Sequence, residues 1–90
     1  MNDSVFKLSV DWVLHKEDLK ETKFFLFNVK DGTIVKLNEI SFDFLSRING
    51  EKNYSLILTE LLKIYDVNEE QLNIDLTALL KKISKFEILI

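Results

Sequence analysis

Apolar residues in the first half of the chain follow the pattern of strands. Phe24–Val29 is an aromatic run bounded by charge, and Thr33–Leu37 is rich in β-branched residues. Both features favour strands over helices. Lys30, Asp31 and Gly32 separate the two runs, and glycine supplies the positive φ that a hairpin turn needs. The pattern predicts an antiparallel hairpin over this region.

Two weaker strand candidates precede this hairpin. Trp12–His15 is a short apolar run followed by a charged segment, and Val5–Val10 could precede or extend it. Neighbouring residues of a strand point to opposite faces. Phe24 and Phe25 therefore point to opposite faces of the sheet. Only one of them can pack in the core, and we expect the other to need a second packing surface on the opposite face.

The second half changes to a helical period. Asn38, Asn53 and Asn68 each precede an apolar repeat and can cap a helix through the side-chain oxygen. Asn49-Gly50 ends the first repeat. The predicted apolar faces are Ile40, Phe44, Leu45 and Ile48, then Ile57, Leu58, Leu61, Leu62 and Tyr65, and finally Leu72, Leu76, Leu79, Leu80 and Ile83. Strands followed by helices predict one α+β domain spanning residues 1–90, with Leu37 also in its core.

Composition excludes several classes of protein. The chain has 90 residues, a net charge of −3 and no cysteine, which leaves no disulfide framework and no thiolate metal site. A nucleic-acid binder normally carries a basic excess. No segment approaches the roughly 20 apolar residues of a membrane span, and the N-terminus does not resemble a signal peptide. We expect a cytoplasmic protein that binds neither nucleic acid nor membrane.

The sequence contains few of the residue types that usually carry catalysis. His15 is the only histidine and lies in a strand-like run, where a half-exposed structural role is expected. No glycine-rich phosphate loop and no calcium-loop spacing of acids occurs. Lys81, Lys82 and Lys85 lie near the end of the third helix, where they complement its dipole. We therefore predict no enzyme, no metal and no cofactor.

Residues from Phe24 to Leu89 resemble the PqqD family, the RiPP recognition elements. The resemblance covers the strand–turn–strand unit, the short helix closed by Asn49-Gly50 and the two helices that follow. It rests on Lys36-Leu37-Asn38-Glu39, on Tyr65-Asp66-Val67, and on Asp75-Leu76 with Leu80 and Ile83.

The resemblance implies a winged-helix-like domain with a three-stranded antiparallel sheet followed by three helices. It also implies binding of the leader segment of a ribosomally made precursor peptide, which is presented to a modifying enzyme. The leader would add as a strand beside Thr33–Leu37, in a groove against the third helix. The expected peptide-binding residues are Thr33, Ile34, Val35, Lys36, Leu76, Thr77, Leu80, Lys81 and Ser84. Lys36 and Lys81 are expected to hold acidic leader residues.

Elementary physics favours the same site. Thr33–Leu37 lacks the proline or dense charge that blunts a sheet edge, and an extended peptide can pair with such an edge. Because side chains alternate, Val35 is expected to form the groove floor, with Ile34 and Lys36 on the other face. Three alternatives remain open: an edge covered by the N-terminal segment, a winged helix that binds DNA, and a purely structural subunit or inhibitor.

Overall fold

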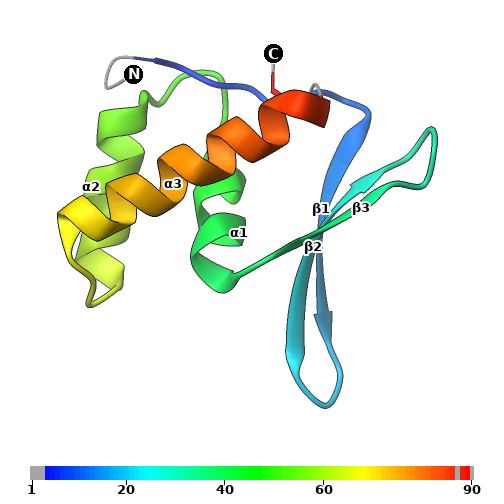
Figure 1. The fold of residues 1–90 in the computed structure, drawn as a ribbon, viewed down its shortest axis with the longest axis horizontal. Coiled ribbons are helices and arrows are strands. Elements are labelled where there is room, and N and C mark those ends of the chain that lie inside the picture. Colours follow the sequence, from blue (N-terminus) through cyan, green and yellow to red (C-terminus); the bar gives the residue numbers. More distant parts are fainter. Residues whose placement is uncertain (1–3, 87, 90) are drawn as a thin grey trace.

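The computed structural model describes residues 4–86 and 88–89. Three strands come first: β1 (Trp12–Asp18), β2 (Thr22–Asn28) and β3 (Ile34–Leu37). Three helices follow, α1 (Glu39–Ser46), α2 (Tyr54–Ile64) and α3 (Glu69–Ile83), and a short 3-10 helix, η1 (Ser84–Phe86), extends α3. The α+β order of three antiparallel strands and three helices is confirmed (Figure 1).

The first strand is longer than the apolar run that predicted it. β1 continues through the charged residues Lys16, Glu17 and Asp18, which pair with the start of β2. Backbone pairing with β2 overrides the poor strand preference of these side chains, because every residue of β1 gains a partner. The proposed strand at Val5–Val10 does not form and contributes only isolated bridges, Val5 to Asn53 and Leu8 to Leu89.

Asparagine caps start all three helices, as predicted. The side chains of Asn38, Asn53 and Asn68 accept hydrogen bonds from backbone N–H groups three residues further on, at 2.8 to 3.1 Å. Helix α1 ends at Ser46, before the predicted stop. Gly50 nevertheless has a φ of 81°, the left-handed conformation that glycine adopts without strain.

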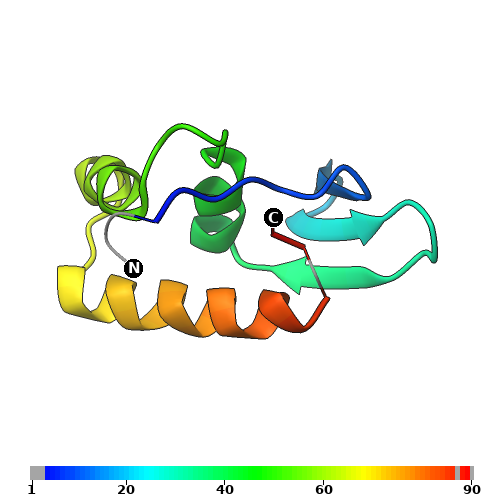
Figure 2. The same ribbon diagram turned by 90° about the horizontal axis from the view of Figure 1, so that it is seen from above.

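The core lies between one face of the sheet and the three helices, which all stand on that side (Figure 2). The strands contribute Trp12, Leu26 and Val35, and Leu37 is only partly buried. The predicted stripe of α3 is confirmed in full. The buried helical residues are Phe44, Leu45, Tyr54, Ile57, Leu61, Leu72, Leu76, Leu79, Leu80 and Ile83.

The two ends of the described chain are joined. The Ser9 N–H donates to the Ile88 carbonyl at 2.7 Å, and the Ile88 side chain is fully buried. Trp12 packs edge-on against Phe86 with ring centroids 6.0 Å apart. The N-terminal segment is therefore bound to the C-terminal segment and to the α2 cap, and β3 keeps its outer edge uncovered by it.

Candidate functional site: the free edge and outer face of the sheet

β3 is an edge strand. Within the described chain the sheet order is β1-β2-β3, so β3 has a neighbour on one side only. Figure 2 shows β3 as the strand next to α3, which runs past its free edge. The edge carries no proline, and Lys36 is its only charged residue. It is therefore open to pairing with another extended chain.

The register determines which backbone groups face outward. The Asn28 N–H donates to the Thr33 carbonyl at 2.8 Å, which makes these two residues a hydrogen-bonded pair. Bonded pairs alternate along an antiparallel ladder. Val35, opposite Leu26, therefore directs its N–H and C=O to β2, whereas Ile34 and Lys36 direct theirs to the free edge. Four backbone groups are thus available to an added strand.

Side chains of β3 alternate as predicted. Val35 is 6% exposed and belongs to the core, while Ile34 is 60% exposed on the other face. Lys36 is exposed on the same face as Ile34, since the two are separated by two positions. Thr33 precedes the strand, and its N–H donates to Asp31 at 2.8 Å. A side-chain hydrogen bond with Thr33, and after it this backbone hydrogen bond, hold the pKa of Asp31 below its ordinary value.

Helix α3 turns one flank toward α2. The Tyr54 hydroxyl donates to the Asn73 side chain at 2.6 Å, and Thr77 is its second hydrogen-bond partner. Burial raises the pKa of Tyr54. Lys81 and Ser84 continue the flank of Asn73 and Thr77, because they follow at helical spacing. We call this flank, Asn73, Thr77, Lys81 and Ser84, the Thr77 flank.

The opposite flank of α3 consists of Asp75, Leu79 and Lys82, and we call it the Lys82 flank. In the view of Figure 1 the start of α2, where Tyr54 lies, is above α3 and β3 is below it, although Figure 2 shows both elements on the core side of α3. Because the Thr77 flank contacts Tyr54, the Lys82 flank is the one turned toward β3. Asp75, Leu79 and Lys82 are therefore a second candidate for the wall of a groove between α3 and β3, beside the expected Thr77, Lys81 and Ser84.

The expected site residues are thus divided among three places. Ile34 and Lys36 lie on the free edge with Thr33 at its start, Val35 lies beneath it, and Thr77, Lys81 and Ser84 lie on the flank facing α2. Leu76 and Leu80 are 1% and 7% exposed, so they support α3 from within the core. Sequence periodicity identifies both flanks of α3 but does not determine which neighbour each one faces.

The outer face of the sheet is apolar, a feature that the sequence reasoning missed. The described helices stand on the other side of the sheet (Figure 2). One cross-strand row comprises Val13, Phe27 and Ile34, which are 47%, 38% and 60% exposed. In the next row His15 stacks on Phe25, with ring centroids 6.4 Å apart. A hollow of about 400 Å³ lies among these side chains, and Glu17 also lines it.

The adjacent phenylalanines of β2 are separated as expected. Phe24 packs on the core side against Phe42 of α1, with centroids 4.9 Å apart. Phe25 points to the outer face, where it has only the His15 ring as an aromatic partner among the described residues. Alternation along β2 could have revealed the outer apolar row, since Phe25 and Phe27 share one face.

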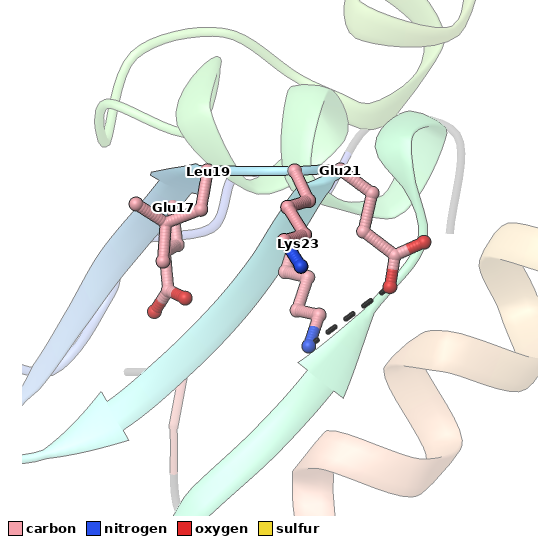
Figure 3. A pocket seen from close by; sticks show the side chains of 5 residues that line it. Glu17, Leu19, Glu21 and Lys23 are labelled. Atoms are coloured by element: carbon pink, nitrogen blue, oxygen red, sulfur yellow. Dashed lines mark ion pairs between the residues drawn. The ribbon is translucent and has the colours of Figure 1, made fainter.

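A wider hollow at the β1–β2 turn is lined by residues that do not indicate a particular ligand. Its volume is about 800 Å³, and it is lined by Glu17, Leu19, Lys20, Glu21 and Lys23 (Figure 3). Lys23 and Glu21 form an ion pair at 3.9 Å. Leu19 is 79% exposed, and the hollow is bounded by long side chains at a hairpin tip. This geometry does not fix a ligand.

The best-organised polar cluster is structural. Asp43 accepts from Arg47 at 2.6 Å and from the Tyr65 hydroxyl at 2.9 Å. Arg47 and Lys52 both donate to Glu60 at 3.0 Å. These bonds join α1 to α2 and to the chain around it. Burial and the neighbouring Asp43 raise the pKa of Tyr65, which keeps its hydroxyl a donor.

The described residues offer neither a metal centre nor a membrane span. No group of three or more His, Cys, Asp or Glu side chains in this part of the chain is placed to hold a metal ion. None of the helices that the structure describes is long and apolar enough to cross a membrane. The free edge of β3 and the apolar face beside it are therefore the features that point to function.

Comparison with known proteins identifies a family and a similar fold. The family model "Coenzyme PQQ synthesis protein D (PqqD)" matches residues 23–87, and none of the curated proteins matches the chain. A similar solved structure is "TbiB1 in Complex with the TbiA(beta) Leader Peptide", at 20% sequence identity and a TM-score of 0.70. The alignment covers 92% of this chain and 93% of that one, so the two share a fold.

The family match covers well over half of the chain and includes β2 from its second residue on, β3 and all three helices. The chain therefore belongs to the PqqD family.

Proposed function

We propose that this chain is a peptide-binding adaptor that receives the leader segment of a ribosomally made precursor peptide as a fourth strand beside β3. The observation that carries the proposal is the free edge of β3, where Ile34 and Lys36 direct unpaired backbone groups outward. Membership of the PqqD family and a fold shared with a protein solved in complex with a leader peptide support it.

The added strand would be held first by backbone hydrogen bonds. Hydrogen bonds to the N–H and C=O groups of Ile34 and Lys36 provide register, and side chains on alternate positions provide specificity. Residues facing inward meet the Lys82 flank of α3, where Asp75 and Lys82 supply an acid and a base and Leu79 is largely buried beneath them. The predicted contacts with Thr77, Lys81 and Ser84 remain a competing arrangement on the other flank.

The role that fits these residues is binding without catalysis. His15 is stacked on Phe25 at the exposed outer face, and the carboxylates of Asp43 and Glu60 are engaged by arginine and lysine. The adaptor would deliver the bound peptide to a modifying enzyme. That enzyme is the second partner of the proposal.

The test is a titration of the isotope-labelled chain with candidate leader peptides, followed by amide chemical shifts. We expect the largest shifts at residues 33–37 and along the Lys82 flank of α3. Shifts confined to α2 would contradict the edge model and favour the DNA-binding alternative. A gel shift at low and high salt then decides that alternative, because phosphate-driven binding falls steeply with salt.

A further inference from the structure

The apolar row on the outer face of the sheet is continuous with the edge at which the peptide would bind. Val13, Phe27 and Ile34 lie opposite one another on β1, β2 and β3. Ile34 is the last member of the row and also one of the two residues whose backbone groups face the free edge. A strand added beside β3 places every second side chain on this same face, so it extends the row by one residue.

The outer face is too apolar for a surface that only meets water. A solvated sheet face normally carries polar residues at these positions, yet all three members of this row are apolar and remain 38–60% exposed. Together with His15, Phe25 and Glu17 they line the hollow of about 400 Å³. An apolar side chain lying beside Ile34 would extend the apolar wall that Ile34 gives this hollow.

Next to Ile34 on the outer face, the exposed residue of β3 is a positively charged lysine. Lys36 is exposed two residues from Ile34, on the same face, and no ion pair among the described residues includes it. Lys23 lies diagonally across from it on β2 and shares a small hollow of about 210 Å³ with it, where Glu21 is the only acid. The Lys23–Glu21 pair is long, at 3.9 Å, and well exposed.

We infer that the outer face is the second half of the peptide site and reads a two-residue signature in the bound strand. A large apolar side chain, preferably aromatic, lies beside Ile34 and extends the apolar row, and an acidic side chain two positions away lies beside Lys36. This inference rests on the proposed function. Aromatic–β-branched and opposite-charge pairs are favourable cross-strand neighbours, and the spacing of two holds whichever direction the peptide runs.

The test works even where the sequence of the precursor is unknown. A library of random peptides displayed on their own messenger RNA is selected against the full chain, and the enriched peptides are aligned. We expect an aromatic or large aliphatic residue two positions from Asp or Glu. Selection against Lys36→Glu should replace the acid by Lys or Arg, whereas Lys63→Glu, an exposed lysine in the last turn of α2, should leave the signature unchanged.

The apolar half is tested on one enriched peptide. Phe27→Thr leaves the backbone of β3 intact but removes a wall of the hollow, and it should weaken binding about two- to fivefold. Val29→Thr, at a loop position that is 55% exposed, should bind like the wild type. Circular dichroism melts establish whether both variants are folded. If Phe27→Thr does not fold, Val13→Thr, which changes another member of the row, is measured in its place.

Two outcomes would overturn the inference, and they are distinguishable. Peptides that bind the β3 edge, as judged by loss of binding in Ile34→Pro, but show no signature and ignore Lys36→Glu would refute the outer site alone. A selection that enriches no peptide over a bead-only control would refute the proposed peptide-binding function and the outer site together.

Discussion

Ile34 and Val35 are neighbours in the chain, yet their side chains point to opposite faces of the sheet and their backbone N–H groups point to opposite edges of β3. Ile34 is 60% exposed and directs its N–H to the free edge, while Val35 is 6% exposed and directs its N–H to β2. One residue therefore belongs to the peptide site and the next belongs to the sheet itself. This relationship allows binding and folding to be separated by two adjacent substitutions.

Proline at these two positions should have opposite effects. Ile34→Pro removes an outward N–H at the first residue of an edge strand, a position that tolerates proline. It should leave the melt close to wild type and weaken binding of a cognate leader about tenfold. Val35→Pro removes a ladder bond and a buried side chain, and should lower the free energy of unfolding by about 2 kcal/mol or more.

Calorimetric titration and thermal melts of both variants provide the measurement. Leader binding by Ile34→Pro at wild-type affinity would mean that the peptide does not pair with this edge. An equally destabilised pair would show that the inferred hydrogen-bonding alternation is wrong.

Two adjacent lysines of α3 offer a second matched pair. Lys82 lies on the flank turned toward β3, whereas Lys81 lies on the Thr77 flank. For an acidic leader, Lys82→Glu should weaken binding by up to about fivefold, in line with ~0.2–1 kcal/mol for an exposed charge pair, and should reduce its salt dependence. Lys81→Glu should have little effect on either.

Both lysines stand in the last turn of the same helix, so each reversal costs similar helix-dipole energy. Differences in binding between the two variants therefore report on position and not on stability. The reverse result, with Lys81 sensitive and Lys82 silent, would restore the flank of Thr77, Lys81 and Ser84 as the peptide-binding wall.

Much of the fold could be predicted because it is encoded locally. The Asn caps, the helical stripes and the positive φ of Gly32 each depend on a few neighbouring residues. The length of β1 could not be predicted, because Lys16–Asp18 are held in the strand by pairing with β2, a tertiary contact.

The candidate site was only half predictable for a related reason. Alternation identified the edge and separated Ile34 from Val35. Helical spacing also grouped Thr77 with Lys81, but the hydrogen bond from Tyr54 to Asn73 determines which way that flank faces. The apolar outer row was visible in the sequence as Phe25 and Phe27, although only the placement of all three helices on one side shows that it is left uncovered.

Core truncations should be costly at positions that the stripes identified. Leu61 is fully buried and Leu76 is 1% exposed, so replacing either by alanine should cost ~2–5 kcal/mol. Ile74→Ala is the matched control on α3, since Ile74 is 54% exposed and should change the free energy of unfolding by less than about 0.5 kcal/mol. Urea denaturation provides the values, and equal losses at Ile74 and Leu76 would contradict the described helix face.

The stability of the domain should depend on pH through Glu60. Hydrogen bonds from Lys52 and Arg47 hold the pKa of Glu60 below its ordinary value. The folded state therefore favours the carboxylate more than the unfolded state does. Its contribution is fully present above the unfolded pKa, about 4.3, and is lost as the pH falls through the lower folded pKa.

Glu60→Gln should therefore be less stable than the wild type near neutral pH, and the gap should close below about pH 4. Removing Lys52, the largest cause of the lowered pKa, supplies the control: in a Lys52→Gln background the Glu60→Gln substitution should cost less at neutral pH. Urea unfolding of the four proteins across the acid range measures both effects. A gap that keeps its size from neutral to acidic pH would show that Glu60 acts through packing, because a lost charge interaction must fade once the carboxylate is protonated.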